Sequence, residues 1–367
     1  MRVCIIFTIL FLFSYSISVS EILCPSCGAT NSDKNEFCDQ CGTSLRNVKL
    51  QWRYKTSDAI YSSPCVVDSK VYVGSCDFYI YCLSAGDGSL VWRYETSDVI
   101  YSSPCVVDGK VYVGSCDFYI YCLSENDGSL VWRYKTGGYV ESSPFVVDGR
   151  VYFGSGDNCI YCLSENDGSL IWKYETADHV YSSPFVVDSR VYVGSLDHYI
   201  YCLSESDGSL VWRYETGDEV WSCPFVLDGR VYVGSFDNYI YCLSAGDGSL
   251  VWRYKTDFYV SSCPCVVDGR VYVGDFDKYT YCLSAGDGSL IWRYKTGGYV
   301  ESSLSIVDGK VYIGSLDNYI YCLSASDGSL VWRYKTGGYV ESTPYIVDGR
   351  VYIGSRDCYI YCLENTD

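Results

Sequence analysis

The chain has 367 residues, enough for two ordinary domains, and contains 40 Tyr, 34 Gly and 22 Cys. This abundance of Tyr and Gly favours many short strands joined by tight turns. The formal net charge of −18 repels nucleic acid and anionic lipid headgroups, so we expect no nucleic-acid partner.

Residues 1–20 have the pattern of an export signal. Arg2 provides a short, positively charged N-terminal region, and residues 3–13 are almost wholly apolar. Small residues precede Glu21, as at a signal-peptide cleavage site. Two outcomes stay open, a cleaved signal peptide and a retained signal anchor. The positive charge lies before the apolar run, so in both cases the rest of the chain faces outside. We therefore expect an extracytoplasmic protein that is secreted or anchored at its N-terminus, with no other membrane contact.

Residues 21–46 carry the pattern of a small metal-binding module. Two Cys-x-x-Cys pairs are separated by ten residues, and Gly28 or Gly42 directly follows each pair. Four thiolates at this spacing suit a tetrahedral structural zinc site and leave no open position for catalysis. The expected zinc ligands are Cys24, Cys27, Cys38 and Cys41.

This segment resembles the short zinc ribbon at the N-terminus of many prokaryotic proteins. Two disulfides among the same four cysteines are the alternative, because an exported segment meets an oxidising compartment.

From Trp52 onward the sequence repeats every 40 residues, and each unit holds four strand-like runs. In the unit that follows Trp92 the runs are 105–107, 111–113, 119–123 and 130–134. A period near 40 with four strands per unit is the signature of a β-propeller. We predict an all-β, eight-bladed β-propeller of four-stranded antiparallel blades over residues 47–367. The repeated tryptophans are Trp52, Trp92, Trp132, Trp172, Trp212, Trp252, Trp292 and Trp332.

The ends of the chain predict how the ring closes. The last unit stops after its third strand at Asp367, whereas residues 48–54 precede the first unit as a spare fourth strand. Pairing this N-terminal strand with the last blade removes free sheet edges. Runs such as 119–123 are apolar on both faces, which stacked blades require.

Three motifs, repeated with small variations, carry a resemblance to a known family: Val-Tyr-Val-Gly-Ser-x-Asp, Tyr-x-Tyr-Cys-Leu and Asp-Gly-x-Leu-x-Trp. Over residues 48–363 the chain resembles the PQQ-repeat, or quinoprotein alcohol dehydrogenase-like, propellers. It also resembles the non-enzymatic BamB-type scaffolds of outer-membrane assembly. The resemblance implies that the Trp of each unit packs on the neighbouring blade. The chain departs from the BamB lipoprotein at residues 21–23, which form no lipobox before Cys24.

The same resemblance argues against an enzyme. Quinoprotein dehydrogenases of this fold need a cofactor pocket, a Ca²⁺ site, a catalytic Asp and usually a vicinal cysteine pair, in insertions that break the repeat. Here every full unit has the same length and no two cysteines are adjacent. The only histidines, His179 and His198, are interpreted as loop residues. We expect no catalytic residues and no bound PQQ.

Aspartate and cysteine also recur along the repeats. Asp77 and Asp87, with their equivalents, fit turn chemistry better than Ca²⁺ coordination, because no loop alternates acidic residues. The third-strand cysteines, such as Cys82, cannot bridge blades, since packed sheets lie ~10 Å apart and a disulfide needs Cα atoms within ~7 Å. We interpret these cysteines as small buried apolar residues.

The eight copies differ mainly in two loops, one joining the fourth strand to the next first strand and one joining strands two and three. In a propeller both loops emerge on one face. Aromatic and charged residues mix there as in interface hot spots, and neutral drift at exposed loop tips is the alternative. The candidate binding-face residues are Tyr61, Tyr101, Glu141, Tyr181, Trp221, Phe258, Tyr259, Glu301, Glu341, Phe78, Phe118, His198, Lys278 and Arg356.

These patterns together predict a non-enzymatic extracytoplasmic binding scaffold that uses the variable loop face. The expected partner is a protein or a glycan at the cell surface. A PQQ-dependent dehydrogenase-like enzyme and a carbohydrate-binding propeller are the alternative functions.

Overall fold

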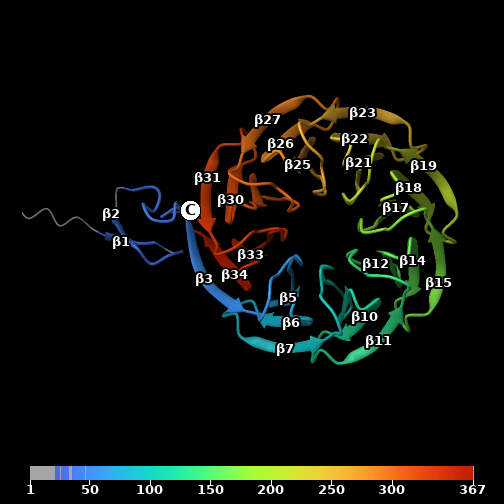
Figure 1. Ribbon diagram of the computed structural model, residues 1–367, viewed down its shortest axis with the longest axis horizontal. Coiled ribbons are helices and arrows are strands. Elements are labelled where there is room, and N and C mark those ends of the chain that lie inside the picture. Colours follow the sequence, from blue (N-terminus) through green and yellow to red (C-terminus); the bar gives the residue numbers. More distant parts are fainter. Residues whose placement is uncertain (1–20, 25, 33–34, 46, 367) are drawn as a thin grey trace, which may run out of the picture.

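The computed structural model describes residues 21–24, 26–32, 35–45 and 47–366, so the expected export signal lies outside the described residues. A small N-terminal sheet pairs β1 (Glu21–Leu23) with β2 (Thr30–Ser32). All other strands form eight four-stranded antiparallel sheets, arranged as blades around a central axis (Figure 1). The predicted eight-bladed β-propeller is confirmed. Within the described ranges, no helix has the length and apolar character needed to cross a membrane.

Each blade runs from an innermost strand to an outer strand, and the equivalent strands differ little in length. The innermost strands are β4 (Cys65–Val67), β8 (Cys105–Val107), β12 (Phe145–Val147), β16 (Phe185–Val187), β20 (Phe225–Leu227), β24 (Cys265–Val267), β28 (Ser305–Val307) and β32 (Tyr345–Val347). The second strands are β5 (Lys70–Gly74), β9 (Lys110–Gly114), β13 (Arg150–Ser155), β17 (Arg190–Gly194), β21 (Arg230–Gly234), β25 (Arg270–Gly274), β29 (Lys310–Gly314) and β33 (Arg350–Gly354).

The two outer layers complete the blades, which are numbered 1 to 8 from β4 to β32. The third strands are β6 (Tyr79–Ser84), β10 (Tyr119–Ser124), β14 (Cys159–Ser164), β18 (Tyr199–Ser204), β22 (Tyr239–Ser244), β26 (Tyr279–Ser284), β30 (Tyr319–Ser324) and β34 (Tyr359–Asn365). The outer strands are β7 (Leu90–Glu95), β11 (Leu130–Lys135), β15 (Leu170–Glu175), β19 (Leu210–Glu215), β23 (Leu250–Lys255), β27 (Leu290–Lys295), β31 (Leu330–Lys335) and β3 (Val48–Lys55).

The middle strands form the core because both of their faces are covered by neighbouring blades. In β6, Ile80, Tyr81, Cys82 and Leu83 are at most 1% exposed. The equivalent cysteines of all the third strands are fully buried, as expected for small apolar residues. Burial raises the pKa of the Cys82 thiol to about 11, so this cysteine remains a neutral thiol.

Each repeated tryptophan joins one blade to the next, as the family resemblance implies. The indole N–H of Trp92 donates a 3.0 Å hydrogen bond to the carbonyl of Glu125 in the following blade. Its ring lies against Gly128, where a Cβ atom would come within 2.6 Å of the ring. Gly128 also has a φ of +71°, so the Asp-Gly turn needs glycine for two reasons.

The ring closes through the N-terminal strand, as predicted from the chain ends. Strand β3 pairs antiparallel with β34, with Trp52 opposite Cys362 and Lys55 opposite Tyr359. The Trp52 indole then donates to the carbonyl of Ala85 in blade 1, at 3.0 Å. The seam therefore carries the same tryptophan contact as the other junctions, except that between blades 7 and 8, where Trp332 donates to Asn365 Oδ1.

The cysteine-rich module packs on the outside of blade 7, beside β31 (Figure 1). The Ser44 N–H donates to the Arg333 carbonyl at 2.8 Å, and the Arg333 N–H donates to Ser44 Oγ at 3.0 Å. The Lys335 N–H donates to Thr43 Oγ1 at 2.8 Å. Trp332 beneath the module is fully buried, whereas the other repeated tryptophans are 7–8% exposed. The module therefore covers a strand edge that stays open in blades 1 to 6.

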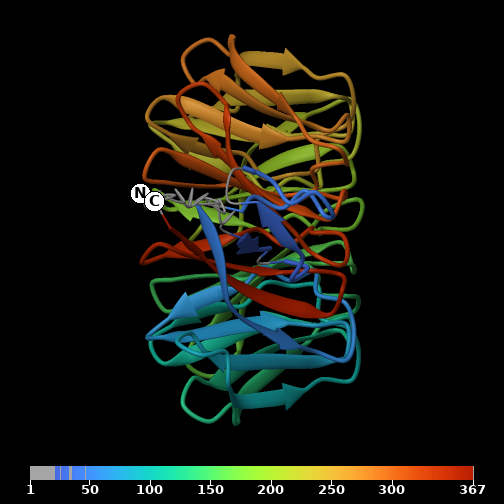
Figure 2. The same cartoon turned by 90° about the vertical axis from the view of Figure 1, so that its left-hand side faces the viewer.

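The side view shows that the module lies against the flank of the disk, between the two loop faces (Figure 2). Its cysteine cluster reaches the edge of the loop face, because Cys27 and Cys41 line a pocket together with Gly337 and Asp357 of the variable loops.

Candidate functional site

The four N-terminal cysteines sit on two similar tight turns. In the first, the Gly28 N–H donates to the Cys24 carbonyl at 3.0 Å, and in the second the Gly42 N–H donates to the Cys38 carbonyl at 2.8 Å. Both glycines have positive φ values, 72° and 71°. These are the backbone turns that the sequence pattern predicts beneath metal-bound thiolates.

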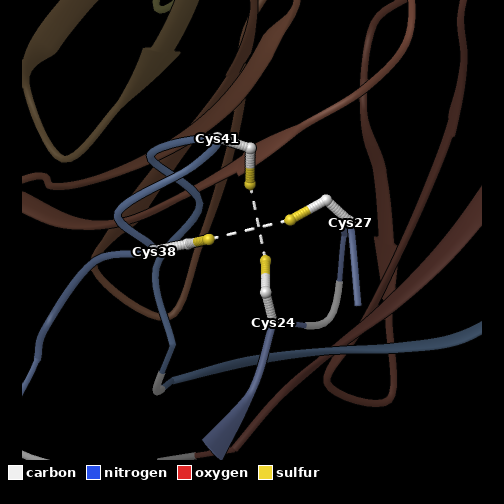
Figure 3. A group of neighbouring side chains, drawn as sticks. All are labelled: Cys24, Cys27, Cys38 and Cys41. Atoms are coloured by element: carbon white, nitrogen blue, oxygen red, sulfur yellow. Dashed lines mark hydrogen bonds between the residues drawn. The ribbon is translucent and has the colours of Figure 1, made fainter. Parts of the chain in front are cut away.

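The turns bring the four sulfur atoms together, all within 4.8 Å of one another (Figure 3). The Sγ atoms of Cys24 and Cys41 are 3.4 Å apart, and those of Cys27 and Cys38 are 3.7 Å apart. Zinc–sulfur bonds of about 2.3 Å in a tetrahedron place the sulfurs about 3.8 Å apart. The donor set and its spacing therefore fit a structural zinc ion.

The four thiols differ in character: burial raises the pKa of Cys24, whereas the pKa of Cys38 is lowered. Against the effect of burial, the backbone N–H groups of Cys41 and Gln40 lower the pKa of Cys38 to about 6. The Asn31 side-chain amide donates to Cys38 Sγ at 3.6 Å. Such donors stabilise a metal-bound sulfur and fix its direction.

The two variable loops lie together on one end of the propeller, as expected. In blade 1 the Cys76 N–H, from the loop between β5 and β6, donates to the Ala59 carbonyl at 2.9 Å. The Ser57 N–H donates to Asp77 Oδ2 at 2.8 Å. Asp77 also accepts from the Tyr81 hydroxyl, at 2.7 Å. The recurring aspartate is thus a turn residue that holds the two loops to each other.

One candidate residue from each of most units lies just before the innermost strand, and these residues encircle the axis. The rings of Tyr61 and Tyr101 meet edge to face with centroids 5.1 Å apart. Arg356 Nη2 lies 2.5 Å from Glu341 Oε1, and its guanidinium stacks over Tyr61 at 4.5 Å. Blades 8, 1 and 2 therefore contribute one connected cluster, with an arginine held between an acid and a tyrosine.

The acidic members of this ring are partly desolvated. The Glu341 side chain is 11% exposed. Burial and the charge of Glu301 raise the pKa of Glu341 to about 7, although the charge of Arg356 opposes them. Burial also raises the pKa of Glu141 in blade 3. A cationic group arriving at this ring would favour the ionised form of these acids.

Aromatic rings form a continuous arc over blades 4 to 7. Tyr181 contacts Trp221 at 5.2 Å, and Trp221 stacks on Phe236 at 5.8 Å. Tyr259 then lies 4.5 Å from Phe236 and 4.1 Å from Phe276. Phe276 in turn stacks on Tyr299 at 5.3 Å. The arc gives this part of the face an aromatic surface, and acids such as Glu219, which accepts from the Trp221 indole at 2.7 Å, lie within it.

Four further candidates lie at the tips of the loops between second and third strands, and Phe258 lies in the loop between β23 and β24. Phe78, Phe118, His198 and Lys278 all have φ values between 73° and 76°. Their side chains meet the next loop: Lys278 Nζ lies 5.9 Å from the Tyr299 ring centroid, for example. Phe258 is 47% exposed and contacts Tyr259 at 4.8 Å. These residues thus add aromatic and charged side chains to the loop face.

Several residues of this surface are absent from the candidate list drawn from the sequence. Tyr139, Tyr299 and Tyr339 are 44–45% exposed, and they share one position of the first variable loop. A pocket of about 430 Å³ lies beside two of them, between Lys278 and Tyr339. Comparing that one position across all eight units would have found them, because it changes from Ala59 through tyrosine, histidine and glutamate.

Comparisons with known proteins agree with this architecture. A family profile described as outer membrane protein assembly factor BamB matches the propeller, and a zinc-ribbon domain profile matches residues 23–45. The propeller matches cover residues 44–119, 77–183, 116–227, 159–275, 200–305 and 277–367. The comparison with curated proteins gave no significant match.

Three solved structures with this fold differ in kind. BamB from Moraxella catarrhalis has a TM-score of 0.76 at 16% identity, covering 86% of this chain and 99% of its own. The computationally designed Ika8 protein has a TM-score of 0.77 at 16% identity, and the match covers 84% of this chain and 97% of that chain. Quinohemoprotein alcohol dehydrogenase ADHIIG from Pseudomonas putida HK5 has a TM-score of 0.75 at 15% identity, and the match covers 91% of this chain and 78% of that chain. At these identities the likeness shows the fold alone.

Proposed function

Because the chain belongs to the family described as outer membrane protein assembly factor BamB, we propose that it is a non-enzymatic, extracytoplasmic scaffold. Its variable loop face binds a protein partner. The observation that carries this proposal is the difference between the eight copies. Most positions barely change, whereas the changes gather in two loops that lie hydrogen-bonded together on one face.

The chemistry of the face supports a protein partner. Exposed aromatic side chains, such as Tyr101 at 37% and Phe258 at 47%, supply contact area at a low cost in side-chain entropy. The acids around Glu341 give the axial end a preference for basic groups. Arg356, stacked on Tyr61 and paired with Glu341, shows within the chain how this surface holds a guanidinium.

Zinc in the N-terminal module has a structural role in this proposal. Four thiolates fill the coordination sphere, so the metal has no open position for water or substrate. The module packs on the flank of blade 7, and we assign it to the stability of its own fold and of that flank.

The experiment that tests the proposal is affinity capture from the native cell surface by three forms of the chain. The first is the wild type, and the second carries Tyr101→Ala with Phe258→Ala on the loop face. The third carries Asn126→Ala with Leu250→Ala, which change an exposed turn of the other face and an exposed rim position. We expect the wild type and the third form to retain the same protein and the loop-face form to lose it at least tenfold. Equal capture by all three forms would contradict the proposal.

The dehydrogenase alternative is tested on the same purified chain. After addition of PQQ and Ca²⁺, dye-linked oxidation of alcohols or sugars is measured. Turnover that depends on PQQ would show that the protein is an enzyme and contradict the scaffold proposal. Specific binding on a glycan array would show that the partner is a carbohydrate and not a protein.

A further inference from the structure

A belt of hydrogen bonds runs around the axis beneath the loop face and joins seven of the eight pairs of neighbouring blades. Its members lie two residues before each innermost strand, and the backbone N–H of one donates to the side chain of its equivalent in the next blade. The Ser63 N–H donates to Ser103 Oγ at 2.9 Å, and the Thr343 N–H donates back to Ser63 Oγ at 2.9 Å. The belt thus continues across the closing seam and holds neighbouring blades together where they are closest.

Two members of this belt are cysteines, in blades 5 and 6. The Cys223 N–H donates to Cys263 Sγ at 3.1 Å, and the Ser183 N–H donates to Cys223 Sγ at 3.3 Å. Cα atoms of the strands that follow them, β20 and β24, come within 8 Å of one another. The two thiols therefore lie in adjacent blades at the narrowest part of the propeller, and both side chains are partly exposed.

We propose that Cys223 and Cys263 form a disulfide that links blades 5 and 6 at the axis when the protein meets a disulfide oxidant. The third-strand cysteines are placed differently, because they lie in the middle of the blades, where neighbouring sheets are farther apart. At the belt, the 3.1 Å contact between the Cys223 backbone nitrogen and Cys263 Sγ places the two residues directly side by side, and a disulfide needs Cα atoms within ~7 Å.

The reaction is a thiol–disulfide exchange with a small disulfide such as oxidised glutathione. The Cys223 thiolate attacks one sulfur of the oxidant, forms a mixed disulfide and releases one glutathione thiolate. The Cys263 thiolate then attacks Cys223 Sγ, forms the intramolecular bond and releases the second thiolate. The two cysteines lose two protons and two electrons, and the oxidant becomes two thiols.

The surroundings favour the first step. The hydrogen bond with the Cys263 thiol, and that from the Ser183 N–H, lower the pKa of Cys223 to about 7 although burial opposes them. The attacking thiolate is therefore present at neutral pH.

The chain offers a matched control pair. Cys65 and Cys105 are also 40 residues apart, in neighbouring innermost strands. In the described structure no hydrogen bond joins their thiols, and burial raises the pKa of each to about 11. They are expected to stay reduced under the same conditions.

Peptide mapping of the full chain tests the proposal. The reduced protein is treated under native conditions with oxidised glutathione, free thiols are alkylated, and protease fragments are analysed by mass spectrometry. We expect one linked peptide pair that contains Cys223 and Cys263, while Cys65 and Cys105 are alkylated. Alkylation of Cys223 and Cys263, or a stable mixed disulfide with glutathione at either one, would overturn the proposal.

Two variants keep the result interpretable. Cys263→Ser restores the residue found at this position in most units, so it should fold, lose the linked peptide and melt at the same temperature with or without oxidant. Cys65→Ser with Cys105→Ser should keep the linked peptide. The wild type should melt at a higher temperature when oxidised, because the crosslink restricts the unfolded chain. No difference in melting temperature would count against a linkage between the blades.

Discussion

A single buried carboxyl group distinguishes blade 6 from the other blades. At the equivalent position a serine usually donates to the preceding loop: Ser235 Oγ lies 3.2 Å from the Asp218 carbonyl and 3.3 Å from that of Glu219. Blade 6 has Asp275 there, fully buried, with Oδ2 lacking a partner in the described structure. Burial, together with the neighbouring Asp277, raises the pKa of Asp275 to about 9. At neutral pH this side chain is therefore a protonated carboxylic acid.

This protonation makes the stability of the propeller depend on pH. A carboxyl whose pKa is higher in the folded state stabilises the fold below its unfolded pKa, 3.8, and this contribution is lost as pH rises through about 9. Asp275→Ser should remove the effect. The free energy of unfolding of this variant should exceed that of the wild type by little near pH 4. The difference should grow toward pH 9, by at most ~1.4 kcal/mol per pH unit.

Urea unfolding at several pH values measures that difference. Ser235→Asp is the matched control in blade 5 and should introduce the same loss of stability at high pH. A constant difference between Asp275→Ser and the wild type across the range would show that Asp275 does not titrate in this way.

The role of a residue can be predicted from the sequence where the repeat pattern constrains it. Where the role depends on how deeply the residue is buried, the sequence does not show it. The departure of Asp275 from serine is visible in the sequence. Its full burial is visible only once the loop of the preceding unit is placed over it. The belt cysteines Cys223 and Cys263 were missed for a related reason, since sequence spacing alone does not show that blades approach closely at the axis.

Among the elements, the strands were predictable and the docking of the cysteine module was not. The predicted run 130–134 became β11 (Leu130–Lys135), and the predicted closing strand 48–54 became β3. Strands β11, β23 and β31 have the identical sequence Leu-Val-Trp-Arg-Tyr-Lys, so no side chain marks β31 as the docking site. The module reaches β31 because Leu45 is separated by only two residues from Val48, where β3 begins.

The cysteine module is expected to contain a bound metal ion. Elemental analysis should find one zinc per chain, because the four sulfurs fit its coordination sphere. Cys24→Ser with Cys27→Ser should abolish zinc binding and leave the propeller folded by circular dichroism. Zinc-free wild type with two disulfides among Cys24, Cys27, Cys38 and Cys41 would establish the alternative.

Removing the module should expose one tryptophan and leave the ring closed. In a chain that lacks residues 21–45, Trp332 loses the cover that keeps it fully buried. Its exposure should approach that of the equivalent tryptophans, with a small red shift of fluorescence and little change in the melting temperature of the propeller. A collapse of the propeller's transition would mean that the module is part of its core.

At the scale of the whole molecule, one strand closes the ring. Strand β3 covers the edge of β34 and carries the Trp52 contact to blade 1. Deletion of residues 46–54 should leave an unpaired strand edge and expose apolar surface of two blades. The exposure costs ~25 cal/mol of stability per Å² of apolar surface. We expect a lower melting temperature and aggregation, measured by calorimetry and light scattering. A monomer with an unchanged melting temperature would refute this closure.

In the proposed function, the variable loop face is the contact surface for a partner. Hydrogen exchange of the captured complex, compared with the free chain, tests it most directly because it reports every segment of the propeller at once. We predict slower exchange in the loops around residues 57–63, 217–223 and 257–263, and unchanged exchange in the Asp-Gly turns of the other face and in the outer strands. Protection confined to those turns or to the outer strands would contradict the claim.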